Sequence, residues 1–311
     1  RAFNNVPESI SASIFLKVPG NDAKRYPLTF QKSQNNNGTY YLENSEKMPL
    51  TVSQNIVDGD DGLRISVSIT ALEDIYFNYS QQVASDFRHN DCLFYMPGFW
   101  YRRNLRSPKE APSFHTSDSW IVSEDRLSAP LTGIFCEKKQ RFMTVNRLDK
   151  FVNSTLATGF ENKDGVATLS FGFPYREAPK SYIRKLTLAP AVTAYQHLKK
   201  GETILLTWQI TEGEAKDYSD FVRHTWEYCY DTYLPKPVDT PYSVEYMKQT
   251  LSQFFVSSFV DKYPLVYNSG IHLRTDACTS NGQAEVGFIG RVLMNAFNAW
   301  EYGWECNRKK E

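Results

Sequence analysis

The chain has 311 residues, of which 41% are hydrophobic and 14% aromatic, and its 35 basic residues balance its 35 acidic ones. This composition supplies enough apolar surface for a large core and excludes a disordered chain. Because no long basic run breaks the even charge, we expect no nucleic-acid partner. Because no apolar run reaches the roughly 20 residues of a spanning helix, we expect no membrane span.

Residues 1–215 are predicted to form an antiparallel β-sandwich. The segment GLRISVSITAL (62–72) alternates apolar and polar residues, which is typical of a strand with one buried face. Further strand-like runs occupy residues 49–57, 141–148, 167–175, 184–195 and 202–211. No helical pattern separates them, so we expect two antiparallel sheets packed face to face. The length of the region indicates a sandwich larger than an immunoglobulin domain.

Residues 216–241 are predicted to form a linker helix and a proline-rich crossing. Aromatic and apolar residues recur at helical spacing over residues 217–233. The segment LPKPVDTP (234–241) ends this helix, because proline lacks a backbone donor and favours extended geometry in the preceding residue. The next helix is predicted to start with Thr240 as its N-cap and Pro241 in its first position.

Residues 242–311 are predicted to form a helical hairpin. The closing helix, 284–305, has two apolar flanks divided by a narrow polar stripe of Arg291, Asn295 and Asn298. Such a helix needs neighbours on both sides, and an uncovered flank would form an unusually large apolar patch. We therefore expect the natural protein to continue beyond Glu311. The alternative is that this helix docks on the sandwich or on a second copy of the chain.

This order of elements resembles the N-terminal half of bacterial carbohydrate-active enzymes that place a β-supersandwich before an (α/α)6 toroid, such as bacterial glucoamylases and inverting glycoside phosphorylases. The resemblance rests on KGETILLTWQIT (200–211), DFVRHTWEYCYDTYLPKP (220–237) and the helix starts at 242 and 284. It implies a mostly β fold, a galactose-mutarotase-like supersandwich, followed by a linker helix and the start of an α/α toroid. It carries over no catalytic residue, since the catalytic acid of those families lies deeper in the toroid.

Segments 94–108 and 114–130 hold the densest group of aromatic and charged residues. Aromatic rings can stack on sugar rings, and charged side chains can hydrogen-bond sugar hydroxyls. The candidate substrate-binding residues in these segments are Trp100, Tyr101, Arg102, Trp120, Glu124, Asp125 and Arg126. The alternative is that the tryptophans fill the core or a domain interface and that the arginines pair with nearby carboxylates.

Glu124 and Asp125 are also a pair of adjacent carboxylates. Glycoside hydrolysis needs two carboxyl groups roughly 5 to 10 Å apart across the scissile bond. Neighbouring residues on an extended strand point to opposite faces, so these two make a poor pair. A salt bridge with Arg126 or Arg102 is the simpler interpretation, and we assign no catalytic residue.

The polar loop 267–283 adds His272 and Asp276 as candidates for substrate binding. This assignment follows from the resemblance, because loops between paired helices surround the substrate cleft of a toroid. An ordinary surface loop is the alternative. No two of the five histidines have metal-ligand spacing, and there is no nucleotide-binding loop, so neither a metal nor another cofactor is predicted.

The sequence therefore predicts the N-terminal part of a carbohydrate-active enzyme, a glycoside hydrolase acting on a polysaccharide or oligosaccharide. The chain by itself should be inactive, and its partners should be a carbohydrate and a further helical domain of the same protein. Three alternatives remain: a non-catalytic carbohydrate-binding module, an interaction protein that docks through its C-terminal helix, and a polysaccharide lyase. The resemblance implies a periplasmic or cell-surface location.

Overall fold

The structure, a computed structural model, describes most of the chain in two compact units, Arg1–Leu234 and Pro235–Glu311. The described residues are 6–33, 38–59, 62–105, 112–148, 154–184, 187–234, 236–257, 271–272, 277–278 and 289–306. Within these ranges, no helix combines the length and the apolar character needed to cross a membrane.

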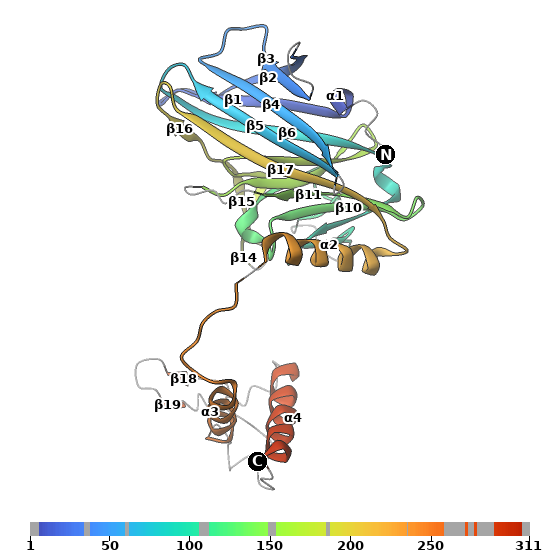
Figure 1. The fold of residues 1–311 in the computed structure, drawn as a ribbon, viewed down its shortest axis with the longest axis vertical. Coiled ribbons are helices and arrows are strands. Elements are labelled where there is room, and N and C mark those ends of the chain that lie inside the picture. The colour runs from blue at the N-terminus through green and yellow to red at the C-terminus, as the bar shows by residue number, and fades with distance from the viewer. Residues whose placement is uncertain are drawn as a thin grey trace. The chain divides into compact units, whose positions relative to one another are not determined.

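The first unit consists mainly of strands that are hydrogen-bonded into one antiparallel network (Figure 1). The strands are β1 (Ile10–Lys17), β2 (Lys24–Lys32), β3 (Thr39–Glu43), β4 (Leu50–Gly59), β5 (Gly62–Ala71), β6 (Ile75–Arg88), β7 (Cys92–Met96), β8 (Trp100–Arg102), β9 (Ser119–Ser123), β10 (Leu131–Cys136), β11 (Arg141–Arg147), β12 (Ala157–Lys163), β13 (Val166–Phe173), β14 (Arg176–Arg184), β15 (Thr187–Thr193), β16 (Gln196–Leu198) and β17 (Thr203–Glu214). The helices of this unit are α1 (Val6–Ser9), the short 3₁₀ turns η1 (His89–Asp91) and η2 (Glu124–Arg126), and α2 (Tyr218–Tyr233).

Strand pairing arranges this network in two layers. Layer A contains, in spatial order, β1, β6, β13, β12 and β9. Layer B contains, in spatial order, β3, β4, β5, β17, β11, β10, β7 and β8. Strand β2 pairs with both β1 and β3 and so joins the layers, while β14 pairs with β9 and β15. The predicted large antiparallel β-sandwich, followed by helices, is confirmed.

The main core lies between the two layers. In β5, Leu63, Ile65, Val67 and Ile69 are buried, as the alternation of that segment predicts. They belong to one apolar cluster that also contains buried residues of β1, β6, β12 and β13. Burying a single such side chain contributes about 1.5–3 kcal/mol, so this cluster is the main source of the sandwich's stability.

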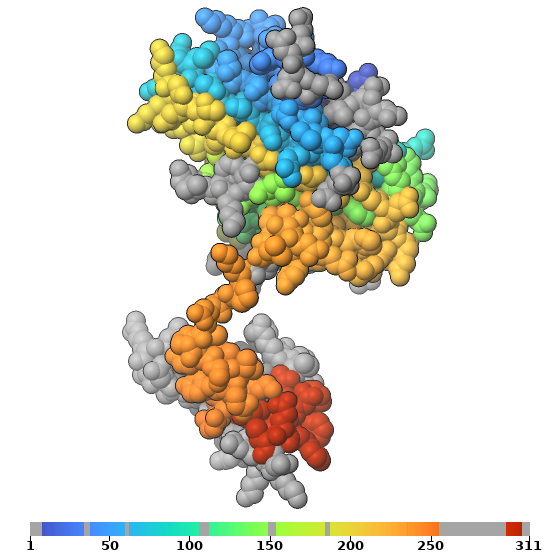
Figure 2. Space-filling model, viewed as in Figure 1, coloured from blue at the N-terminus to red at the C-terminus, as the bar shows by residue number. Residues whose placement is uncertain are grey.

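Helix α2 packs on the face of layer B that points away from the main core, and its residues cover one side of the sandwich unit in Figure 2. Asp217 caps the helix by accepting from the backbone N–H of Asp220 at 2.9 Å. Phe221 is fully buried and stacks on Phe135 with ring centroids 5.7 Å apart. A Cβ at Gly133 would lie 2.7 Å from Phe221, so glycine permits this close approach. The helix predicted as a linker thus lies on the sandwich.

The second unit contains α3 (Val244–Ser257), the two-residue strands β18 (Ile271–His272) and β19 (Ala277–Cys278), and α4 (Ile289–Glu305). The N-cap of α3 is Ser243 rather than the predicted Thr240, because the Ser243 hydroxyl accepts from the backbone N–H of Tyr246 at 3.1 Å. A cap of this kind bonds the third residue of its helix, which Thr240 does not reach. Tyr302 of α4 donates to Glu245 of α3 at 2.7 Å.

His89 is a buried histidine without a hydrogen-bond partner for either ring nitrogen within the described ranges. Its ring contacts those of Phe94 and Phe114, with centroids 4.9 and 4.4 Å away. Burial lowers the pKa of His89, and the nearby Arg103 lowers that pKa further. The unfolded chain therefore binds this proton more readily than the folded one, and stability falls as the pH drops below about 6.5.

We expect His89→Phe to remove this acid-side loss of stability. Phenylalanine fills a similar volume and has no ring nitrogen to protonate. Lowering the pH from 8 to 5 should lower the melting temperature of both proteins. The drop should be smaller in the variant than in the wild type, by about 2 °C or more. Thermal unfolding followed by circular dichroism checks this, with the exposed His115 replaced by Phe as the matched control. Equal pH dependence in the wild type and His89→Phe would contradict the assignment.

Candidate functional site

Trp100 and Trp120 lie in the main core, with exposed fractions of 0% and 1%. The indole N–H of Trp100 donates to the Arg102 carbonyl at 3.1 Å, and that of Trp120 donates to the Ser113 carbonyl at 2.8 Å. Both tryptophans thus satisfy their polar group internally, as buried tryptophans usually do. The interpretation of these two rings as sugar-stacking surfaces is wrong, because neither has a face that solvent can reach.

Tyr101 and Arg102 are exposed at the surface of layer B. The Tyr101 hydroxyl accepts from the Gly98 backbone N–H at 3.1 Å. The Arg102 guanidinium lies over the Tyr218 ring at 5.0 Å, a cation–π contact between β8 and α2. Since Tyr218 also accepts from the Arg102 backbone N–H at 3.0 Å, Arg102 helps to dock α2.

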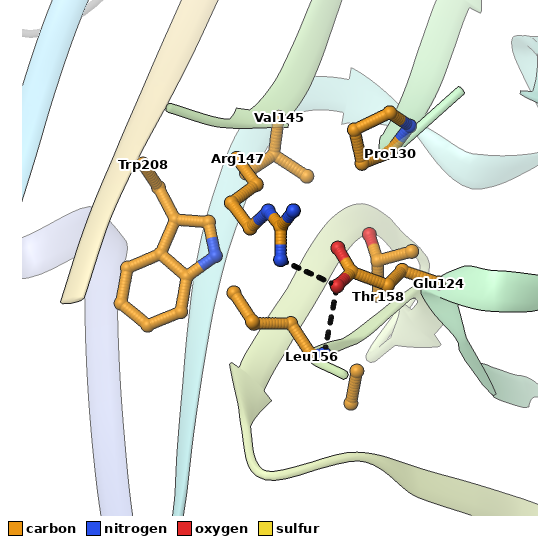
Figure 3. Close-up of a pocket in the computed structure, with 8 residues that line it drawn as sticks. Glu124, Pro130, Val145, Arg147, Leu156, Thr158 and Trp208 are labelled. Atoms are coloured by element: carbon orange, nitrogen blue, oxygen red, sulfur yellow. Dashed lines mark hydrogen bonds and ion pairs between the residues drawn. The ribbon is translucent and has the colours of Figure 1, made fainter. Parts of the chain in front are cut away.

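Glu124 lies in η2 and points into a small pocket beside Trp208 (Figure 3). Its carboxylate accepts from the Arg147 guanidinium at 2.8 Å and from the Leu156 backbone N–H at 3.1 Å. The partner of Glu124 is thus Arg147, and not Arg126 or Arg102, which the sequence suggested as salt-bridge partners for the Glu124–Asp125 pair. Burial raises the pKa of Glu124, and the Arg147 charge opposes that rise.

The Glu124 pocket is too small for a sugar ring. It is lined mainly by apolar side chains, and the space in it that water can reach is about 10 Å³, which is roughly what one water molecule needs. The Glu124 carboxylate and the Arg147 guanidinium pair with one another across the pocket, so the arrangement is that of a partly buried structural ion pair.

Arg126 forms a second ion pair, with Glu177 of β14. The Arg126 Nη2 atom lies 3.0 Å from Glu177 Oε2, and its Nε atom contacts the other carboxylate oxygen. The Ser181 hydroxyl also donates to Glu177. Asp125, between the two paired residues, is exposed. The turn η2 thus anchors β11 through Glu124 and β14 through Arg126, and its two carboxylates do not form a catalytic pair.

The remaining predicted site residues belong to the second unit. His272 lies in β18, and Asp276 lies outside the described residues. In the part of the chain that the structure describes, no three His, Cys, Asp or Glu side chains are grouped as metal ligands.

A different group of polar residues lies on the face of layer A that points away from the core. In β6, Val83 is buried in the core and Gln82 points the other way, and in β12 Phe160 and Glu161 divide in the same manner. We call this group the outer polar cluster. Its members are Ser11 of β1, Arg25 of β2, Gln82 of β6, Ser119 of β9, Glu161 and Lys163 of β12, and Arg176 of β14.

Gln82 connects the cluster across three strands. Its amide nitrogen donates to Glu161, and its amide oxygen accepts from Ser11 at 3.1 Å and from Lys163 at 3.4 Å. These contacts fix the orientation of the amide, with its donor side toward the carboxylate. Ser119, opposite Glu161 in the β9–β12 ladder, lowers the pKa of the acid.

Strand β13 runs between Gln82 and Glu161 and presents small residues there. Ser170 lies opposite Gln82 on one side and opposite Gly159 on the other. A Cβ at Gly159 would lie 2.2 Å from the Trp120 carbonyl oxygen, so this position requires glycine. The Ser170 hydroxyl is buried and has no hydrogen-bond partner within the described ranges. The small residues leave room for the Gln82 side chain to cross β13.

Burial shifts the pKa values of two charged residues of the cluster, Glu161 and Arg176. It raises the pKa of Glu161, while the charges of Lys163, Arg176 and Arg25 act in the opposite direction. It lowers the pKa of Arg176, and the like charge of Arg25 lowers that pKa further. Because Gln82, Glu161 and Arg176 are half-buried rather than enclosed, their free donors and acceptors can still reach a ligand from solvent.

The outer polar cluster did not emerge from the sequence, although one signal was present. In the strand-like run 167–175, large Phe171 and Phe173 alternate with small Ser170 and Gly172. That alternation indicates an outer face with little side-chain volume. It does not show which polar residues of other strands reach across that face, because Gln82 and Glu161 are far apart in the chain.

No family model matches the chain, and no curated protein matches it. Solved structures that are similar to it include a galactose mutarotase-like protein from Clostridium acetobutylicum, with 9% identity, a TM-score of 0.40, and coverage of 68% of this chain and 82% of that one. A second is a GH36 alpha-galactosidase from Geobacillus stearothermophilus in complex with raffinose, with 10% identity, a TM-score of 0.41, and coverage of 65% of this chain and 30% of that one. A third is a polysaccharide lyase, with 10% identity, a TM-score of 0.35, and coverage of 70% of this chain and 27% of that one.

The fold and the candidate site together define a large antiparallel β-sandwich protein with a polar outer face.

Proposed function

We propose that the sandwich binds a carbohydrate on the outer face of layer A, at the outer polar cluster. The observation that carries this proposal is the Gln82–Glu161 hydrogen bond, which holds a part-exposed carboxylate beside cationic donors. Sugar hydroxyl groups donate and accept at the same time, so they are matched by a face on which fixed acceptors and donors alternate. The partly exposed Phe15 ring, beside Arg176, adds an apolar surface to this face.

The proposal is one of binding rather than hydrolysis. A glycoside hydrolase needs two carboxyl groups on either side of the scissile bond. Glu161 is the carboxylate of the cluster, and the Glu124 carboxylate is taken up by its ion pair with Arg147. The geometry of the described residues therefore supports carbohydrate binding, the function expected of a non-catalytic carbohydrate-binding module.

Glu161→Gln tests this proposal. The substitution keeps the shape of the side chain but removes the charge that strengthens hydrogen bonds from sugar hydroxyls. Since a hydrogen bond to a charged group contributes about 1.5–3 kcal/mol, we expect affinity for the bound glycan to fall by about tenfold or more. A glycan array of neutral and acidic oligosaccharides finds the ligand, and calorimetry with the full chain measures the change.

The matched control is Glu43→Gln, which changes an exposed glutamate of β3 in layer B. It should bind as the wild type does, and both variants should keep the wild-type melting temperature to within a few degrees. Equal affinity of Glu161→Gln and the wild type would move the binding site away from the outer polar cluster.

A further inference from the structure

Arg176 is a half-buried cation whose guanidinium has no hydrogen-bond or ion-pair partner among the described residues. It is the first residue of β14, where its backbone pairs with Thr193 of β15, and its side chain makes no hydrogen bond or ion pair within the described ranges. Its guanidinium lies 5.9 Å from the centre of the Phe15 ring, and Glu161 influences it only at longer range. Charges removed from water are normally paired, because burial penalises an unpaired charge. As far as the described residues go, the N–H donors of Arg176 therefore have no protein acceptor and can contact a ligand.

Arg25 approaches the same aromatic ring. It lies opposite Phe15 in the β1–β2 ladder, and its guanidinium is 6.0 Å from the ring centre. Two guanidinium groups thus lie beside one ring, and like charges so placed repel one another. An anion that contacts both groups would relieve this repulsion and fill the unused donors.

The outer polar cluster as a whole carries a net positive charge. The cations that act on Glu161 are Lys163, Arg176 and Arg25, three positive charges against one carboxylate. The cluster as a whole therefore attracts anions. Guanidinium groups match planar carboxylates particularly well, because their paired N–H donors fit the two oxygens.

We propose that Arg25 and Arg176 form a subsite for the carboxylate of an acidic saccharide, so that the ligand of the outer face contains a uronic acid. This inference rests on the proposed function and names its substrate class. The uronate carboxylate lies between the two guanidinium groups beside Phe15. The hydroxyl groups of the sugar face the Gln82 and Glu161 side chains, which recognise the uncharged part of the ligand.

The test uses three oligosaccharide probes of equal length with the full chain. They are an oligogalacturonate, its methyl ester, which has the same sugar and linkage without the charge, and a sulfated oligogalactan. We expect the free acid to bind at least about tenfold more tightly than the ester in calorimetry at 0.15 M salt. Its affinity should also fall as salt is raised, since screening weakens an exposed charge contact.

Arg176→Gln should remove the preference for the free acid and leave weak binding of the ester unchanged. The matched control is Arg64→Gln, which removes an exposed arginine of β5 in layer B and should leave the preference intact. Thermal unfolding of both variants checks that the sandwich is folded.

The outcomes separate the two proposals. Equal binding of the acid and the ester would overturn the carboxylate subsite and leave the carbohydrate-binding face in place. Tight binding of the sulfated probe alone would overturn the uronate in favour of a sulfate ester. Binding of none of the three probes, together with an empty glycan array, would contradict both the subsite and the proposed function.

Discussion

Trp100→Ala should destabilise the sandwich by about 3–5 kcal/mol, which is the usual cost of deleting a buried aromatic side chain. Trp100 is fully buried, and its ring makes edge contacts with Phe114 and Phe160 at 5.0 Å. Alanine would leave a cavity in the core and free the Arg102 carbonyl that the indole contacts. Urea unfolding, followed by the signal of the β-sheet, measures the loss.

The control for this experiment is Trp226→Ala in α2. Trp226 is 43% exposed, and its indole donates to the Tyr95 hydroxyl at 2.6 Å. Losing that contact should lower the free energy of unfolding by about 1 kcal/mol. A loss for Trp100→Ala no larger than that of the control would mean that Trp100 is not part of the core.

Arg126→Met should destabilise the sandwich by about 3 kcal/mol. The Glu177 side chain is 4% exposed, and its carboxylate pairs with the Nε and Nη2 atoms of Arg126. Without Arg126 it would keep the Ser181 hydroxyl as its polar contact and remain a poorly compensated buried charge. Unfolding in urea at pH 7 measures the effect.

A double variant separates the charge from the packing at this site. Replacing both Arg126 and Glu177 by Met removes the unpaired charge, so the double variant should be more stable than Arg126→Met alone. If the double variant loses as much unfolding free energy as Arg126→Met and Glu177→Met together, the two side chains act independently. That result would contradict the bidentate pairing.

The regular elements could be predicted from the sequence because their signals are local. The alternation over residues 62–72 corresponds to β5, Gly62–Ala71, and the helical spacing over 217–233 corresponds to α2, Tyr218–Tyr233. Both patterns state directly which face is apolar, and burial follows from that. The N-cap of α3 was missed by three residues, because Thr240 and Ser243 are equally suitable as caps and only the backbone path decides between them.

The candidate site could not be predicted, because its contacts join residues that are distant in the chain. Aromatic and charged residues crowd together near Trp100 and Trp120, but the tertiary fold turns both rings inward. Glu124 pairs with Arg147 rather than with its sequence neighbours. The Gln82–Glu161 contact depends on the order of β6, β13 and β12 in layer A, and no local pattern encodes this order.

A crystal structure of the full chain with the oligosaccharide that it binds most tightly tests the central claim most directly. The account predicts a sugar on the outer face of layer A, within hydrogen-bonding distance of Glu161 and Gln82 and next to Arg176. A sugar bound elsewhere, for example on the exposed surface around Tyr101 and Arg102, would contradict the assignment of the site to the outer polar cluster.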